Sequence, residues 1–149
     1  MSEQTIQTAI QTTLEALANF QPGAVVINDW RRLDGSLQLS PYAIIETADQ
    51  FNSRQDSVTP VTQWVIPVTI LVRFTDWPES YNALRDLRQA IIDGFNTVGD
   101  DRSPGAGAVL ASVIRSDGPV GEWYDNYNGQ PGPAPIFITQ RLVLEVEEF

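Results

Sequence analysis

The clearest pattern in the chain is an alternation of apolar and other residues over residues 62–74, TQWVIPVTILVRF. One side of this segment is apolar throughout: Trp64, Ile66, Val68, Ile70, Val72 and Phe74. A two-residue period in β-branched and aromatic residues predicts one long strand with a fully apolar face. Such a strand needs a cover for that face and partners for its backbone groups. Pro67 has no N–H group to give a ladder, so we expect it at a bulge or facing a sheet edge.

Two segments repeat apolar residues at the spacing of an amphipathic helix. The first spans residues 2–20, with Ser2 as a possible cap and Gln21-Pro22-Gly23 as a stop. The second runs from Asp76, which can cap it, to Phe95. The expected apolar stripes are Ile6, Ile10, Leu14 and Leu17 in the first helix, and Tyr81, Leu84, Leu87, Ile91 and Phe95 in the second.

The remaining patterned segments predict strands at residues 24–30, 42–48, 108–116 and 136–149. Between them, residues 49–60 are expected to form a long polar loop at the tip of a β-hairpin, and residues 117–135 an irregular loop rich in glycine and proline. Hairpin connections favour an antiparallel sheet. The sequence therefore predicts a single α+β domain over residues 1–149, a mainly antiparallel sheet with two amphipathic helices packed on one face.

The second face of the two longest predicted strands is only half polar. It carries Thr69, Arg73, Arg141 and Glu145, but also Val65, Leu71, Phe137 and Val143. Because large exposed apolar patches mark interaction sites, we expect another copy of the protein or a partner to cover this face.

Charge and composition exclude several classes of chemistry. The formal net charge is −10, all nine basic residues are arginine, and the chain has no lysine, histidine or cysteine. Disulfides, thiolate chemistry, Schiff-base lysines, histidine-based triads and typical zinc sites are therefore excluded. An acidic surface also disfavours nucleic-acid binding driven by phosphate contacts. The sequence contains neither an apolar run long enough to span a membrane nor a secretory signal pattern.

Few carboxylate groupings could do chemistry. Glu145 and Glu147 share a predicted strand face and could act as acid and base in glycoside hydrolysis, but consecutive acids at a strand end are typical of a solvated terminus. The acidic pair at residues 100–101 and the segment 125–129 lack the surrounding ligands of a cation site. The glycines at 105 and 107 lack the rest of a dinucleotide fingerprint. We therefore predict no catalytic, metal-binding or cofactor-binding residue, no cofactor, and no enzyme activity.

Aromatic residues in the predicted loops are the better signal. Trp123, Tyr124 and Tyr127 lie among glycines and prolines, and such residues are enriched at protein interfaces. They could equally stack on sugar rings, or fold down to close the end of the helix–sheet sandwich. Phe51 and Arg54 are the expected contact residues of the long hairpin tip. Alternatively, Phe51 packs back onto the sheet and Arg54 is merely solvated.

The order of elements, with the segments PYAII (41–45) and PIFITQRLVL (135–144), resembles the tail terminator, or tail completion, proteins of long-tailed bacteriophages. In that family an amphipathic helix precedes a strand of Pro-aromatic-Ala-Ile character. A long hairpin strand, a helix opened by an aspartate (here Asp76) and a closing strand follow. The resemblance covers nearly the whole chain and is one of pattern and order. Residues 117–135 are longer than the family pattern.

The resemblance implies a structural virion protein at the neck end of the tail, assembled in the host cytoplasm. Copies would form a sixfold ring that caps the tail tube and terminates its polymerisation. One face would bind the tail tube protein and the other the head–tail connector protein. DNA would pass through the ring without specific binding, and no membrane is involved. A ring needs two different patches on each copy that meet head to tail.

Three other functions remain open at this stage. A head–tail connector or neck protein of the same virion would share the ring geometry. A carbohydrate-binding module would use Trp123, Tyr124 and Tyr127, and an acidic hydrolase would use Glu145 and Glu147.

Overall fold

Two long antiparallel strands form the centre of the molecule, as the alternation pattern predicts. The computed structural model describes residues 3–17, 20–30, 39–54, 60–96, 110–127 and 130–148. Within these ranges the elements are α1 (Glu3–Ala16), β1 (Val25–Ile27), β2 (Tyr42–Ile45), β3 (Asp49–Arg54), β4 (Pro60–Arg73), α2 (Trp77–Asn96), β5 (Leu110–Ser116), β6 (Gly121–Tyr127) and β7 (Gln130–Glu148). β4 and β7 pair from Thr62 opposite Glu148 to Arg73 opposite Phe137.

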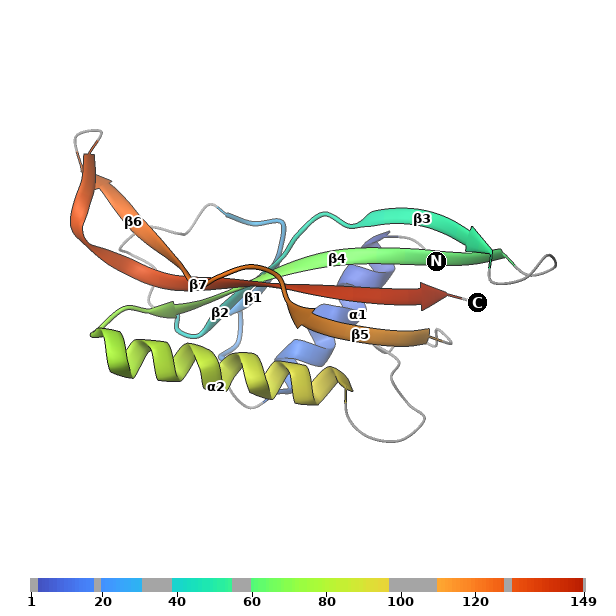
Figure 1. The fold of residues 1–149 in the computed structure, drawn as a ribbon, viewed down its shortest axis with the longest axis horizontal. Helices are drawn as coiled ribbons and strands as arrows, with labels where there is room; N and C mark the ends of the chain where they lie inside the picture. The colour runs from blue at the N-terminus through green and yellow to red at the C-terminus, as the bar shows by residue number, and fades with distance from the viewer. Residues whose placement is uncertain are drawn as a thin grey trace.

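Each central strand carries two shorter strands in succession along its outer edge (Figure 1). β2 and then β3 pair with β4, while β5 and β6 pair with β7, all antiparallel. β1 lies outside β2 and is parallel to it. The described strands form one seven-stranded sheet of order β1-β2-β4-β7-β5, with β3 on β4 and β6 on β7. The predicted α+β class with a mainly antiparallel sheet is confirmed.

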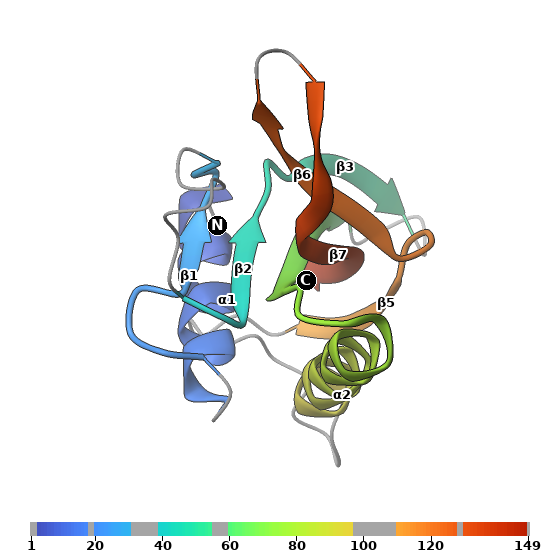
Figure 2. The ribbon, with the colours of Figure 1, turned by 90° about the vertical axis from the view of Figure 1, so that its left-hand side faces the viewer.

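Both helices pack on the same face of this sheet (Figure 2). The main core combines the alternating apolar residues of β4 with the stripes of the two helices. Its fully buried members include Ile6 and Ile10 of α1, Ile66 and Ile70 of β4, Leu84 and Ile91 of α2, and Leu142 and Leu144 of β7. Burial of these side chains removes apolar surface from water, which is the main favourable term in folding.

The edge of β4 has a bulge where Pro67 lies. Ile45 is opposite Val68 and Asp49 is opposite Val65, so three residues on this edge face two on β4. The Glu46 N–H donates to the Pro67 carbonyl at 2.9 Å. The N–H and C=O of one strand residue point toward the same neighbouring strand, so an N–H at position 67 would also point toward the bulge. The missing N–H of Pro67 therefore costs no regular ladder hydrogen bond. The predicted location of Pro67 at a bulge is confirmed.

Polar side chains of α1 satisfy the backbone groups that the bulge leaves without ladder partners. The Gln7 side-chain amide donates to the Glu46 carbonyl at 3.0 Å, and the Ala48 N–H donates to the Glu3 carboxylate at 3.0 Å. Gln7 is itself buried. Buried backbone groups need such partners because an unpaired one costs about 1–3 kcal/mol. Part of the polar side of α1 therefore holds the helix against the bulge at the edge of β4.

Two segments predicted as loops are strands. Residues 49–54 form β3, paired with β4, while residues 121–127 form β6 and residues 130–135 belong to the beginning of β7. Long-range pairing with an unsatisfied strand edge overrides the weak local strand preference of these polar, glycine- and proline-rich segments. The β6–β7 pairing is irregular, as expected for strands that contain prolines: its register shifts between Trp123 and Tyr124 and again between Tyr124 and Asn126.

The second face of the sheet has a core of its own within the chain. Ala24, Tyr42, Ile44, Leu71 and Phe137 are buried together there, with Phe20, Val26, Leu39 and Ile136 packed against them. The expectation that another copy must cover Leu71, Phe137 and Val143 is therefore wrong, since all three are already buried in one chain. The reason is that Phe20 and Ala24 before β1 and Leu39 before β2 pack on this face.

The second helix begins as predicted and exposes one residue that was expected to be buried. Asp76 caps α2, accepting the Glu79 N–H at 2.9 Å. Tyr81 is 43% exposed, so its assignment to the apolar stripe is wrong. It lies on the flank of the stripe, whereas Leu84, Leu87, Ile91 and Phe95 are buried as predicted. Neither α1 nor α2 is both long and apolar enough to cross a membrane.

Candidate interface site

The β6–β7 hairpin extends beyond the end of β4. β4 stops at Arg73 opposite Phe137, with one further bond from the Phe74 N–H to the Ile136 carbonyl at 2.9 Å. Beyond that point β6 is the one partner of β7 among the described strands, and the hairpin rises away from the sheet at one end of the molecule (Figure 1). Residues 130–135 of β7, about 20 Å of strand at about 3.3 Å per residue, lie beyond this last bond to β4. The end of the hairpin therefore projects from the rest of the sheet.

A pair of tryptophans lies at the base of this hairpin. Trp123 of β6 is opposite Phe137 in the register, and its ring stacks on Trp30 with centroids 6.2 Å apart and planes 24° apart. Both rings remain more than one-third exposed, at 37% for Trp123 and 38% for Trp30. Large, partly exposed aromatic side chains supply contact area at protein interfaces. The structure thus places Trp123 in an exposed aromatic pair, with a partner that the sequence analysis did not single out.

Tyr124 is partly buried beside the hairpin base. Its hydroxyl donates a hydrogen bond to the carboxylate of Glu122 on the same strand. This hydrogen bond, with smaller contributions from desolvation and the negative charge of Glu122, raises the pKa of Tyr124 above its usual value.

The base of the hairpin is tied to α2 by a buried amide. The Arg88 guanidinium donates to the Gln140 side-chain oxygen at 2.9 Å, and the Gln140 amide donates to the Gly118 carbonyl at 3.3 Å. Gln140 is only 5% exposed. Gly118, in the corner between β5 and β6, has a φ of +101°, which favours glycine. This chain of bonds fixes the corner from which β6 departs.

The other predicted contact residues are placed by their backbone alone. Phe51 is opposite Gln63 and Arg54 is opposite Pro60, so both are on β3 and not on a loop. Tyr127 is opposite Gln130 at the far end of the β6–β7 hairpin. The side chains of these three residues lie outside the described part of the structure, and their interface role stays a prediction. The fold places Arg54 and Tyr127 at opposite ends of the central strands (Figure 1).

The carboxylate considered for hydrolysis has a structural partner. Glu145 lies 3.4 Å from Arg115 of β5, in an ion pair across the second face of the sheet. The Glu147 side chain lies outside the described residues, as do the acidic pair at 100–101 and the glycines at 105 and 107. In the described ranges no three acidic side chains gather to hold a metal ion.

A second ion-pair group lies on the same sheet face. The Arg141 guanidinium is 3.6 Å from Glu46 and 3.9 Å from Asp117, and Thr69 donates to Glu46 at 3.0 Å. These side chains cover the middle of the face that the sequence showed as half polar. Exposed ion pairs contribute little stability, about 0–1 kcal/mol each.

The sequence analysis missed a second exposed aromatic group on α2. Trp77 is 46% exposed and packs edge-on against Phe74, with ring centroids 5.2 Å apart. Tyr81 follows one turn later, and Arg85, with a side chain 52% exposed, one turn after that. The sequence does contain a signal for this group: Trp77, Tyr81 and Arg85 are spaced four residues apart, which places all three on one side of a helix.

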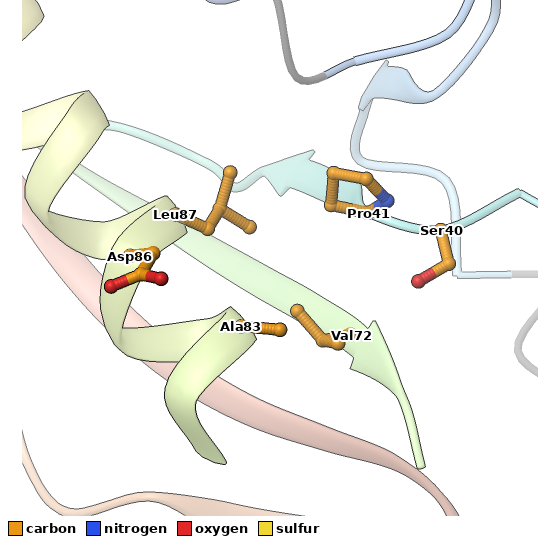
Figure 3. Close-up of a pocket in the computed structure, with 6 residues that line it drawn as sticks. All are labelled: Ser40, Pro41, Val72, Ala83, Asp86 and Leu87. Atoms are coloured by element: carbon orange, nitrogen blue, oxygen red, sulfur yellow. The ribbon is translucent and has the colours of Figure 1, made fainter. Parts of the chain in front are cut away.

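A pocket lies on another side of the same helix. It has a volume of about 360 Å³ and is lined by Ser40, Pro41, Val72, Ala83, Asp86 and Leu87. Figure 3 shows Ala83 extending from α2 toward Val72 of β4, with Pro41 and Ser40 across the opening. The Ser40 hydroxyl accepts the Arg73 N–H at 3.0 Å, which fixes the turn before β2. Apolar walls with a few polar groups are the usual lining of a binding pocket.

No protein-family model matches this chain, and no curated protein sequence matches it either. The resemblance to phage tail terminators therefore depends on the order of elements and on the two segments quoted above.

Proposed function

We propose that the protein is a structural component of a phage virion, a tail terminator that forms a ring on the end of the tail tube. The observation that carries this proposal is the placement of the β3–β4 and β6–β7 hairpins at opposite ends of one rigid strand pair (Figure 1). A cap must contact the tube on one side and the head connector on the other. A subunit with distinct contact elements at its two ends meets that need.

The charge of the chain is compatible with a ring around DNA. A net charge of −10 keeps phosphate from binding the wall of the bore, so DNA passes through during ejection without being held. The exposed pair Trp30 and Trp123 at the hairpin base supplies a contact surface for the tube or the connector. A ring whose bore is lined mainly by arginine would contradict the proposal that negative charge lines the path of the DNA.

Electron microscopy of tails assembled by a phage that lacks this protein tests the role. Overlong tails are expected, because nothing would stop addition of tube subunits. Tails of normal length that fail to join heads would instead assign the protein to the connector or neck, which the same two-ended geometry also supports. Normal virions would contradict both roles.

Light scattering on the purified chain tests the ring itself. A particle of about six times the chain mass of 16.5 kDa is expected, since a head-to-tail interface with a closing rotation gives a cyclic oligomer. A monomer at all concentrations would contradict the ring.

A further inference from the structure

We propose that α2 joins one copy of the chain to the next: an exposed ridge on one side of α2 seats in the pocket on the other side of α2 in the neighbouring copy. The ridge consists of Trp77, Tyr81 and Arg85. The pocket is the one lined by Ser40, Pro41, Val72, Ala83, Asp86 and Leu87. The inference rests on the self-association in the proposed function and names the surfaces that make it.

The ridge has the residues that dominate binding energy at protein interfaces. Tryptophan, tyrosine and arginine are the three types most enriched among such residues. Here they follow one another at intervals of four along α2, so they form one continuous stripe. All three are 43% exposed or more: Trp77, Tyr81 and the Arg85 side chain. Grouped exposed aromatic side chains of this kind mark interaction sites.

The pocket is complementary to the ridge in shape and charge. Its walls Pro41, Val72, Ala83 and Leu87 are apolar, and a volume of about 360 Å³ is within the range that accommodates ring-shaped groups. Asp86 supplies a carboxylate at its edge, with a side chain 76% exposed. An aromatic ring of the ridge would fill the apolar part, and Arg85 would meet Asp86 of the neighbouring copy. Arg85 and Asp86 of one chain lie 3.7 Å apart at their closest, so the contact would extend an existing ion pair.

The two surfaces lie on different sides of one helix. Ala83 is two residues from both Tyr81 and Arg85, and residues two apart in an α-helix point in nearly opposite directions. The side near Arg88 faces β7 and the β5–β6 corner, while Ala83 and Leu87 face the start of β2. A ridge that binds a different patch on an identical copy makes a head-to-tail interface. Such an interface closes into a ring when the rotation between copies allows it.

Two variants, mixed together, test this geometry. Trp77→Ala removes the ridge and keeps the pocket, while Ala83→Trp fills the pocket and keeps the ridge. Each variant alone should be monomeric by light scattering, with a dissociation constant raised more than tenfold. An equimolar mixture should form a one-to-one dimer and nothing larger, because only one intact ridge and one intact pocket remain per pair. Asp86→Arg, at an exposed position, serves as a second pocket variant.

The matched control is Ala16→Trp, which makes the same change as Ala83→Trp at an exposed position of α1, outside both surfaces. It should assemble as the unaltered chain does, and all variants should keep the same melting temperature within a few degrees. If the unaltered chain forms a ring and the ridge and pocket variants do too, the α2 contact is wrong while the ring stands. If the variants are monomeric but their mixture never forms a dimer, the pairing of ridge and pocket is wrong. If the unaltered chain is monomeric, both the α2 contact and the ring are wrong.

Discussion

Gln140 of β7 accepts a hydrogen bond from Arg88 of α2, with 2.9 Å between the two side chains, and donates one to the Gly118 carbonyl. A single buried amide thus joins the second helix, the central strand and the corner that leads into the β6–β7 hairpin. Because the amide is buried, both of its polar atoms need partners.

Replacing this amide should loosen the hairpin base. Gln140→Ala removes both hydrogen bonds and leaves Arg88 without this acceptor, so we expect the free energy of unfolding to fall by about 1–3 kcal/mol. Urea denaturation measures the change. Gln89→Ala, exposed on the same helix, should change it by less than about 0.5 kcal/mol. Equal effects of the two substitutions would contradict the role given to Gln140.

Phe137 should be as important for stability as a residue of the main core. It is fully buried in the second core. Phe137→Ala leaves a cavity and should lower the free energy of unfolding by about 3–5 kcal/mol in the isolated chain, measured by urea denaturation. Phe137→Leu retains most of the volume and should cost less. A loss below about 1 kcal/mol for the alanine variant would show that this face is not covered within one chain.

The stacked tryptophans should be energetically coupled. A double-mutant cycle with Trp30→Ala and Trp123→Ala should give an interaction energy of about 0.5–1.5 kcal/mol, because the two rings are in contact. Chemical denaturation of the four proteins measures it. Trp30→Phe preserves an aromatic ring and should retain part of the coupling. Additive effects of the two alanine substitutions would mean that the stacking contributes nothing.

The ionisation of Tyr124 should depend on Glu122. The hydrogen bond to Glu122 and the negative charge of Glu122 raise the pKa of Tyr124. The contribution of this hydrogen bond to the stability of the folded state is therefore present below the usual tyrosine pKa of about 10, and it is lost as the pH rises through the raised pKa. Glu122→Gln removes the charge and should lower the pKa of Tyr124 toward its usual value. Tyrosinate absorbance against pH measures the shift, and Tyr124→Phe identifies which titration belongs to this residue. An unchanged titration in Glu122→Gln would contradict the assigned cause.

Local signals in the sequence predicted the elements that carry their own pattern. The alternation around Ile66 and Ile70 predicts β4, and Asp76 predicts the beginning of α2, because period and capping depend on neighbouring residues alone. The missing N–H of Pro67 predicts a bulge or a position facing a sheet edge for the same kind of reason, since it is a property of the residue itself. Of the predicted contact residues, the structure describes the side chains of Trp123 and Tyr124.

Only the tertiary structure decided which segments complete the sheet and which surfaces remain exposed. Residues 49–54 became a strand because the edge of β4 needed hydrogen-bond partners, and the segment itself has little strand preference. Trp30 and Trp123 meet because β6 is drawn along β7, a pairing between distant parts of the chain that no local pattern encodes. Tyr81 stays exposed although its neighbours Ser80 and Leu84 are buried, because it lies at the margin of the buried side of α2. The sequence alone thus determined the long strands, the helices and the acidic surface, while long-range pairing determined the hairpins and the exposed aromatic surfaces on which the proposed contacts depend.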